Sequence, residues 1–302
     1  MSEKRYPQGW YYLLASKEVP KNKIIPLKFF DKSFAIGRDS NGKLELFDAH
    51  CPHLGAHLGY GGKFEGEHIV CPYHGFKHKV DQRCAKGFKI KSWTVKENKG
   101  MIFFWYGPRE NAPIYELPNF NGLTKKLLTL NFRKIIVNAS ITEIIENMPD
   151  LDHYIYVHKM RKTKISKYEI KDHKFIFNFN IDTKATFLED KKSLCKNICY
   201  GPGVLWVELT NTFNMYEIIL LTPIDKNRTQ FVQSFMIPKF FNPLKFIALY
   251  LPLIYISKRE LKKDQTLWEN KIQGGNDYQL FAEKHIFQLR EWVNSYLIPP
   301  PN

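Results

Sequence analysis

Four residues that can bind a transition metal lie in two short segments of the chain. Each segment pairs one cysteine with one histidine, as Cys51-Pro-His53 and as Cys71-Pro-Tyr-His74. Two thiolates and two imidazoles are the ligand set of a Rieske [2Fe–2S] centre, in which the cysteines hold one iron and the histidines hold the other. The two segments therefore predict one-electron chemistry at an iron–sulfur cluster.

Zinc is the alternative metal, because two cysteines and two histidines can also hold zinc tetrahedrally. Zinc sites usually group like ligands, as C-x2-C followed by H-x3-5-H. Each segment here mixes the two types, as C-x-H and C-x2-H, which favours a cluster with unlike irons. A zinc-dependent binding module stays as a rival interpretation.

A carboxylate and two histidines form a second candidate site, spaced as Asp150-x2-His153-x4-His158. Two histidines and one carboxylate make up the facial triad of non-haem Fe(II) oxygenases, which leaves coordination positions open for O2 and substrate. Five positions along a regular helix correspond to a turn of about 140°. Both imidazoles can therefore face one metal only if the helix is interrupted or ends there, and Pro149 favours such an irregularity.

The residues around the cysteine and histidine segments resemble the Rieske domain of the Rieske non-haem iron oxygenases. The similar stretches are Cys51-Pro-His-Leu-Gly-Ala-His-Leu-Gly-Tyr-Gly-Gly and Ile69-Val-Cys-Pro-Tyr-His-Gly-Phe, and 17 residues separate His53 from Cys71. The resemblance implies a [2Fe–2S] cluster. Its ligands would be Cys51, His53, Cys71 and His74.

The segment from Asn147 to His158 is similar to the mononuclear iron motif of the same family, N-x2-D-x2-H-x4-H, and follows the cluster segments in the expected order. The resemblance implies that His153 and His158 bind Fe(II). Asn147 and Asp150 of this motif are the catalytic candidates. Asp152 is interpreted as a surface or capping residue.

The resemblance also implies a third iron ligand, an aspartate far downstream on a C-terminal helix. Asp264 is the matching residue, in a D-x3-W-x2-K segment similar to that of members acting on steroids and other large apolar substrates. Such members include steroid 9-hydroxylases and cholesterol 7-desaturases, which have no small β-subunit. The alternative third ligands are Glu260, Glu269 and Asp277.

Asp150 has a different implied role. In the family, this aspartate bonds both an iron-bound histidine and a cluster histidine of the neighbouring subunit. Carried over, Asp150 would join His153 to His74 of another chain. The resemblance therefore implies a head-to-tail homotrimer.

Short strands must position the cluster segments. Residues 8–106 form short β-like stretches separated by turn signals, which predicts an all-β domain with the metal on two hairpin tips. The prolines from Pro108 to Pro118 indicate a connector. We expect a Rieske domain over residues 1–115, a catalytic domain over residues 116–302 and the α+β fold class.

The catalytic half alternates between strand and helix patterns. Residues 127–138 are β-like, a helical pattern runs from Ile141 to Pro149, and residues 166–237 predict an antiparallel sheet. Residues 257–296 predict helix with a break at two glycines. The resemblance implies a helix-grip, START-like fold, in which the sheet wraps a long C-terminal helix and encloses an apolar cavity.

The formal net charge of the 302 residues is +15. Excess Lys and Arg attracts polyanions, but the lysines are scattered and no nucleic-acid motif is recognisable. We expect a solvated basic surface and no nucleic-acid partner. An acidic electron donor would also be attracted to this surface.

Cysteine usage favours the cytoplasm. The respiratory type of Rieske protein has a disulfide between its two loops, and Ala56 and Tyr73 stand in those places here. Three cysteines remain beyond the cluster candidates, Cys84, Cys195 and Cys199, and are expected to be reduced thiols. The N-terminus carries no apolar export segment.

Within the segment from Phe240 to Ser257, the uncharged apolar run from Phe246 to Ser257 is too short to span a membrane, which takes roughly 20 residues. Buried core is the preferred interpretation. The flanking basic residues keep open a peripheral contact with the inner face of a membrane.

The sequence thus predicts the terminal oxygenase component of a Rieske-type monooxygenase. NAD(P)H would supply electrons through a reductase or ferredoxin, and mononuclear Fe(II) would activate O2 to oxidise an apolar, steroid-like or aromatic substrate. Hydroxylation is expected, while demethylation, desaturation and cis-dihydroxylation by a dioxygenase stay open. The rival is a Rieske electron-transfer protein with no metal at His153 and His158.

Overall fold

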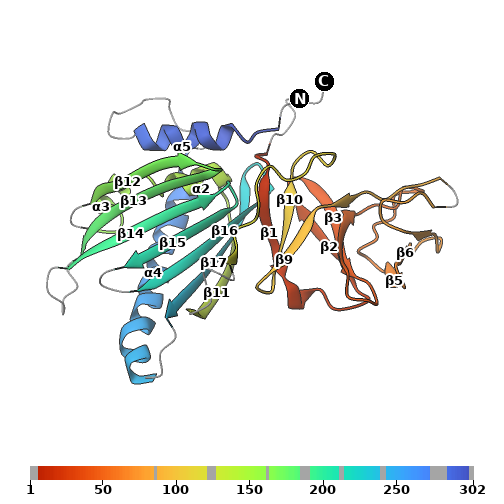
Figure 1. The fold of residues 1–302 in the computed structure, drawn as a ribbon, viewed down its shortest axis with the longest axis horizontal. Helices are drawn as coiled ribbons and strands as arrows, with labels where there is room; N and C mark the ends of the chain where they lie inside the picture. The colour runs from red at the N-terminus through yellow and green to blue at the C-terminus, as the bar shows by residue number, and fades with distance from the viewer. Residues whose placement is uncertain are drawn as a thin grey trace. The chain divides into compact units, whose positions relative to one another are not determined.

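The computed structural model describes residues 6–84, 87–120, 127–160, 163–183, 191–210, 214–238, 243–272 and 284–298 (Figure 1). These residues form two compact units. One unit comprises Gln8–Ile114 with Ile224–Lys226, and the other contains the rest of the described chain. The expected division into a Rieske domain over residues 1–115 and a catalytic domain over residues 116–302 stays a prediction.

The N-terminal unit consists of three small antiparallel sheets, with strand orders β1-β10-β9, β2-β3-β4-β8 and β5-β6-β7. A short 3-10 turn, η1, follows the first strand at Ser16–Glu18. The strands are β1 Gly9–Ala15, β2 Ile24–Phe29, β3 Lys32–Arg38, β4 Leu44–Asp48, β5 Lys63–Glu65, β6 His68–Val70, β7 Lys77–His78, β8 Ser92–Trp93, β9 Val95–Asn98 and β10 Met101–Tyr106. The all-β domain expected for this part of the chain is confirmed.

Aromatic side chains fill the core of this unit. Strand β10 lies between β1 and β9, and its residues from Ile102 to Tyr106 are all buried. Tyr106 stacks on Phe30, and Phe34 meets Phe104 and Trp93 edge to face. Burial of rings of this size supplies most of the driving force for folding. This aromatic core joins the sheets β1-β10-β9 and β2-β3-β4-β8, and a second apolar cluster that includes Phe47, Phe64 and Ile69 joins the latter to β5-β6-β7.

The second unit is built on one seven-stranded antiparallel sheet, in the order β11-β17-β16-β15-β14-β13-β12. Its strands and helices are β11 Leu127–Val137, α2 Ile141–Glu146, α3 Leu151–Tyr156, β12 Thr163–Lys171, β13 Lys174–Thr183, β14 Lys191–Tyr200, β15 Val204–Thr210, β16 Met215–Asp225, β17 Arg228–Pro238, α4 Pro243–Asn270 and α5 Lys284–Asn294. Figure 1 shows α4 passing behind strands of the sheet. The predicted antiparallel sheet, the long C-terminal helix and the α+β class are confirmed.

Helix α4 begins earlier than the sequence predicted. It runs for 28 residues from Pro243, so the expectation of helix only from about residue 257 was wrong. Proline fits the first turn of a helix, where its missing N–H has no partner to lose. A second proline, Pro252, is accommodated within the helix.

The apolar run before residue 257 therefore belongs largely to α4, and residues 239–242 lie outside the described residues. Its expected burial is wrong for Tyr255 and Ile256, whose side chains are 69% and 43% exposed. A helix packed against a sheet by one stripe leaves its other side open to solvent, where Tyr255 lies, whereas Ile256 borders an apolar cavity of the same unit. Among the described residues, none of the helices combines the length and apolar character that crossing a membrane requires.

Candidate active site

Two short helices carry the Asn147 to His158 segment. Ser140 caps α2 through a reciprocal pair of hydrogen bonds with Glu143, and Asn147 is the last, C-capping residue of this helix. The carboxylate of Asp150 then caps α3 by accepting from the backbone N–H of His153 at 3.0 Å. The capping role considered for Asp152 thus belongs to Asp150, and Asp152 is exposed.

Helix α5 fixes the end of α2. Arg290 donates from Nε and Nη2 to the two carboxylate oxygens of Glu146, at 2.7 and 3.0 Å. Such a forked ion pair is directional, and Glu146 is almost fully buried. The contact holds the residues that follow Glu146, including Asn147, in one position.

His153 and His158 face the same point because α3 ends between them. The helix stops at Tyr156, so His158 lies beyond its last turn. The ring centres of the two histidines are 5.0 Å apart. Ligand atoms of His153, His158 and Asp264 all lie within 4.8 Å of one another, which is close enough for one metal ion to contact all three.

The ring of His153 is oriented by the backbone. Its Nδ1 lies 2.6 Å from the carbonyl oxygen of Asp150. Because a carbonyl only accepts hydrogen bonds, Nδ1 carries the proton, which leaves the lone pair of Nε2 for a metal. In this structure the ring of His153 contacts the carbonyl of Asp150, and the carboxylate contacts the backbone N–H.

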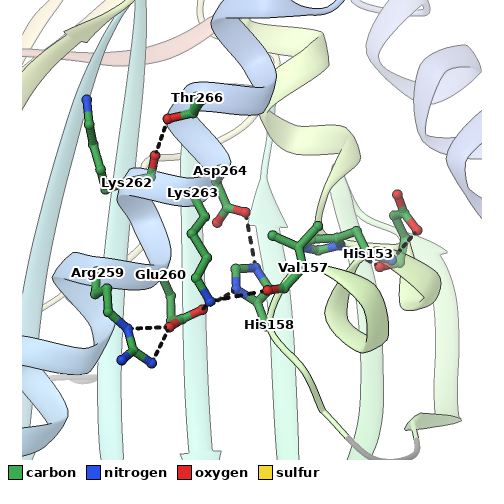
Figure 2. A network of polar contacts seen from close by, with 10 residues as sticks. His153, Val157, His158, Arg259, Glu260, Lys262, Lys263, Asp264 and Thr266 are labelled. Carbon is green, nitrogen blue, oxygen red and sulfur yellow. Dashed lines mark hydrogen bonds and ion pairs between the residues drawn. The ribbon is translucent and has the colours of Figure 1, made fainter.

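The ring of His158 lies between two carboxylates of α4 (Figure 2). Its Nδ1 donates to Glu260 at 2.9 Å, and its Nε2 is 3.1 Å from Oδ1 of Asp264. The two carboxylates stand four positions apart, so they lie on one face of the helix. Lys263 and Arg259 bond Glu260 from the solvent side.

These contacts shift the pKa values of the site. Burial lowers the pKa of His153, which favours the neutral form that binds metals. Burial acts in the same sense on His158, but the carboxylates of Asp264 and Glu260 outweigh it and raise its pKa. Against its own burial, Lys263, His158 and Arg259 lower the pKa of Glu260 to about 2.

The donor set fits a divalent iron. Oδ1 of Asp264 is buried and, among the described residues, accepts no hydrogen bond of good geometry. A buried carboxylate oxygen without a well-aligned hydrogen bond costs free energy unless a cation lies beside it. With the imidazoles of His153 and His158 grouped beside it, the donor set matches the two histidines and one carboxylate of a facial triad.

Two of the alternative third ligands, Glu260 and Glu269, are engaged in other contacts. Glu260 is engaged with Nδ1 of His158, and Glu269 accepts hydrogen bonds from Asn138 and Gln265. Asp277 lies outside the described residues. Among the described carboxylates, Asp264 is the one grouped with both histidines.

An apolar cavity of about 320 Å³ opens beside the three candidate ligands. Strands β13 to β17 form one wall, and alternate residues of these strands point inward as the pleat requires. The motif residue Asn147 lines the cavity as well. Apolar residues in its wall include Ile144, Phe179, Val207, Ile219, Leu221 and Trp268. Such a lining excludes water and favours an apolar ligand.

The two cysteine loops of the N-terminal unit share one backbone geometry. The N–H of Cys51 bonds the carbonyl of Ala56, and the N–H of Gly55 bonds the carbonyl of Cys51. The same pair of bonds joins Cys71 to Phe76 and Gly75. Gly55 and Gly75 both have positive φ, 75° and 68°, which closes the turns at low cost in glycine.

The four candidate cluster ligands meet between these loops. Cys51 and Cys71 are buried on a common apolar cluster, and the rings of His53 and His74 are 5.0 Å apart. Burial raises the pKa of the Cys51 thiol, and the adjacent Cys71 thiol adds to this. Nδ1 of His53 is buried without a hydrogen-bond partner among the described residues. Two crowded thiols and an unpaired ring nitrogen fit metal ligation.

Sequence reasoning missed three residues beside these sites. Glu260 was considered only as a ligand. His78 contacts Cys51, and Glu217 lines the apolar cavity. A carboxylate at a position of β16 whose inward neighbours are Met215 and Ile219 is the signal that could have identified Glu217.

Comparison with known protein families gives two matches. Residues 9–95 match the Rieske [2Fe–2S] domain. Residues 104–297 match the 3-ketosteroid 9α-hydroxylase C-terminal domain.

Three curated relatives resemble nearly the whole chain. A cholesterol 7-desaturase of Hemicentrotus pulcherrimus is 31% identical, over 96% of this chain and 70% of the relative. A cholesterol 7-desaturase of Drosophila melanogaster is 25% identical, over 96% and 75%. The oxygenase component of 3-ketosteroid-9-alpha-monooxygenase from Mycobacterium tuberculosis is 23% identical, over 97% and 82%.

Among solved structures, dicamba monooxygenase bound to dicamba has a similar fold, with a TM-score of 0.74 over 95% of this chain and 96% of that chain. The identity is 17%, so this likeness concerns the fold.

Proposed function

The chain belongs to the Rieske oxygenases with a C-terminal domain of the 3-ketosteroid 9α-hydroxylase type, and from this membership we propose that it oxidises an apolar, steroid-like substrate. It is an oxidoreductase, and its cofactors are a Rieske [2Fe–2S] cluster and a mononuclear iron. A reductase or ferredoxin supplies the electrons, ultimately from NAD(P)H, and O2 is the co-substrate. The match to a catalytic C-terminal domain argues against a pure electron carrier, and the Rieske match argues against a zinc module.

The mononuclear iron is held by His153, His158 and Asp264 in this proposal. The supporting observation is the convergence of their ligand atoms within 4.8 Å, together with the buried Oδ1 of Asp264, which faces Nε2 of His158 at 3.1 Å without a well-aligned hydrogen bond. The iron, when bound, supplies the activation of O2. Glu260 and the carbonyl of Asp150 hold the two imidazoles so that each presents Nε2.

The cluster ligands are Cys51, His53, Cys71 and His74. The equivalent hydrogen bonds of the two loops support this assignment. So do the burial of both thiols and the unpaired Nδ1 of His53.

The remaining residues of the second site position the substrate. The apolar sheet face binds the hydrocarbon part and keeps water from the candidate ligands. Asn147 stands in the cavity wall at the end of α2, where it contacts whatever occupies the cavity. Its role is therefore catalytic or positioning, through direct contact with substrate.

Asp150 connects the two metal centres in the assembly that we propose, a head-to-tail homotrimer. Its carboxylate would bond His74 of the next chain while its carbonyl holds His153. Asp150 is half-buried, so the residue keeps part of its surface accessible to a partner. This arrangement would give electrons a path from the cluster of one chain to the iron of another.

Hydroxylation by monooxygenation is the outcome that we propose, because related chains include a 3-ketosteroid-9-alpha-monooxygenase component. Desaturation is the second outcome that we propose, because other relatives are cholesterol 7-desaturases. Aromatic substrates, dioxygenation and demethylation are the further outcomes to be tested. A cytoplasmic location and a peripheral contact of the apolar part of α4 stay predictions, which fractionation and sedimentation with anionic lipid vesicles would test.

The decisive experiment loads the purified protein anaerobically with Fe(II) and sulfide and follows O2 uptake with a surrogate reductase. Steroids, aromatics and N-methylated compounds serve as substrates, and mass spectrometry of the products separates hydroxylation from desaturation. We expect about three iron atoms per chain, counting the cluster as two, and steroid-dependent O2 uptake. Uptake with aromatics alone would overturn the steroid assignment. An iron content of about two after loading would overturn the mononuclear site.

A further inference from the structure

Glu217 is an unusual residue in the wall of the apolar cavity. It lies on β16 between Met215 and Ile219, whose side chains line the same cavity. Residues two apart on a strand point to the same face of the sheet. The carboxyl group of Glu217 is therefore directed toward the space that the hydrocarbon part of a ligand would occupy.

Among the residues that the structure describes, no basic side chain forms an ion pair with Glu217. The hydrogen-bond partner that the described residues provide is the amide of Gln233 on β17, which donates to Oε1. Burial raises the pKa of the Glu217 carboxyl to about 7. A buried carboxyl group held by a single neutral amide costs stability, so it is not explained by folding.

Glu217 also differs from its polar neighbours in the wall. Asn197 on β14 donates through Nδ2 to the carbonyl of Phe177 and is almost fully buried. Gln233 is similarly buried. Glu217 keeps part of its surface open to the cavity.

We propose that Glu217, oriented by Gln233, binds a hydroxyl group of an otherwise apolar, steroid-like substrate and so fixes which carbon faces the iron site. This inference rests on the function proposed above. The three candidate iron ligands and Glu217 line one cavity, so a molecule held at Glu217 presents its other end or edge to them. A hydroxyl group is a neutral partner that can donate to a carboxylate and accept from a carboxylic acid. An ammonium group would need a buried ion pair, with a larger desolvation cost.

The test uses four compounds with one carbon skeleton: 5α-androstan-3β-ol, the 3-ketone, the 3β-amine and the parent hydrocarbon. Dissociation constants for the iron-loaded protein are measured by quenching of tryptophan fluorescence, since Trp268 lines the cavity. We expect the alcohol to bind about 10- to 100-fold more tightly than the hydrocarbon, the range for a hydrogen bond to an ionisable group.

Two variants of Glu217 test whether this residue causes the preference for the alcohol over the hydrocarbon. Glu217→Leu should remove it, so that alcohol and hydrocarbon bind alike, while Glu217→Gln should keep part of it because an amide still bonds a hydroxyl group. The matched control is Glu208→Gln on β15. Glu208 contacts Lys196 and Trp206 rather than the cavity, and its variant should keep the wild-type preference.

The outcomes separate this inference from the proposed function. If all four compounds bind wild-type protein alike, or if Glu217→Leu and Glu217→Gln both keep the preference, the role of Glu217 is wrong and the steroid assignment stands. A stronger preference for the amine or the ketone overturns the hydroxyl assignment. If none of the compounds binds, the steroid substrate class is wrong, and the role of Glu217 falls with it.

In the N-terminal unit, the buried ring of His78 lies beside the cluster candidate Cys51. This residue of β7 is 1% exposed, and its Nε2 lies 3.4 Å from Sγ of Cys51. Its Nδ1 is buried without a hydrogen-bond partner among the described residues. A thiolate that binds iron can only accept a hydrogen bond, so with the cluster present the ring proton is on Nε2.

We infer that His78 donates an N–H···S hydrogen bond to Cys51 and raises the reduction potential of the cluster. Reduction adds one negative charge, and a donor at a ligand sulfur stabilises the more negative state. His78 does not bind iron in this inference. It acts through Cys51, so its role is positioning and electronic tuning.

Redox titration of the cluster, followed by electron paramagnetic resonance, tests this role. We expect His78→Leu to lower the midpoint potential and His78→Gln, which keeps an N–H donor, to stay near the wild type. His68→Leu, at an exposed residue of the neighbouring strand, is the control. An unchanged potential in His78→Leu overturns the inference. If His78→Leu does not assemble a cluster, a lowered potential in His78→Gln overturns it.

Discussion

His158 donates through Nδ1 to the carboxylate of Glu260 at 2.9 Å, across 102 residues of sequence. Helix α4 supplies both the partner of Nδ1 and, one turn later, the carboxylate of Asp264 beside Nε2. A carboxylate on the far nitrogen fixes the tautomer of a metal-binding histidine and increases its basicity. Helix α4 thus orients His158, which follows α3, and supplies the third residue of the proposed ligand set.

Glu260→Gln should weaken iron binding without abolishing it. The amide can still bond Nδ1, but the charge that favours Nε2 as a donor is lost. Loss of such a partner typically costs about 10- to 100-fold in metal affinity. Competition with a chelator, read as mononuclear iron retained against chelator concentration, measures the change. Glu269→Gln on the same helix is the control. Equal affinity in Glu260→Gln and wild type would contradict the orienting role.

Asp264→Ala should lose the mononuclear iron and keep the cluster. Its carboxylate is the third proposed ligand, and removing it leaves two imidazoles that hold Fe(II) poorly. Iron content should fall from about three to about two per chain, with an unchanged visible spectrum of the cluster. Asp152→Ala, at an exposed carboxylate nearby, should keep all the iron. Full retention in Asp264→Ala would assign the ligand to another carboxylate.

The sequence predicted the residues of both candidate sites because fixed local spacing carries the information. Each cysteine loop brings its own histidine, and the aspartate and two histidines lie within nine residues of one another. The hydrophobic periodicity also identified the antiparallel sheet. Local patterns of this kind are available without tertiary structure.

Contacts between distant segments were not predictable in the same way. Nothing local distinguishes Glu260 as a partner of His158 from Glu260 as a ligand, because the two roles differ only in which nitrogen the carboxylate faces. The start of α4 was missed because the helix-like composition, rich in Lys, Glu, Leu and Gln, begins only near residue 257, whereas the first half of α4 is a uniformly apolar run. The position of Glu217 could be recognised only from the structure, because its side chain faces an internal cavity that the sequence does not reveal.

Glu217 should make the stability of the protein depend on pH. Burial raises the pKa of its carboxyl from 4.5 to about 7, so the folded state binds the proton more tightly than the unfolded state. The protonated carboxyl contributes its full share to the free energy of unfolding below pH 4.5. This share, up to about 3 kcal/mol, is lost as the pH rises through about 7 and the folded protein must hold a buried charge.

Thermal unfolding of wild type and Glu217→Gln at pH 5 and pH 8 measures this effect. The amide does not titrate, so the variant should gain stability relative to wild type at the higher pH. Glu208→Gln, at a residue that faces away from the cavity, corrects for general effects of charge. A constant difference between Glu217→Gln and wild type at both pH values would mean that Glu217 titrates normally.

Asp150→Asn should separate the structural role of Asp150 from its proposed role in electron transfer. Asparagine caps helices as well as aspartate does, and the carbonyl that holds His153 is unchanged. Both metal sites should therefore stay loaded, and thermal stability should change by less than about 1 kcal/mol.

Transfer between the centres should slow strongly, because the carboxylate that would bond His74 of the next subunit is gone. Single-turnover oxidation of the pre-reduced cluster by O2, with substrate bound, gives the rate. Asp152→Asn is the control, since Asp152 is exposed on α3. Asp150→Ala should in addition lose the cap of α3 and part of its iron. A wild-type transfer rate in fully loaded Asp150→Asn would contradict the proposed bridge to His74 of the next subunit. The helix cap would then be the one remaining role of the Asp150 carboxylate.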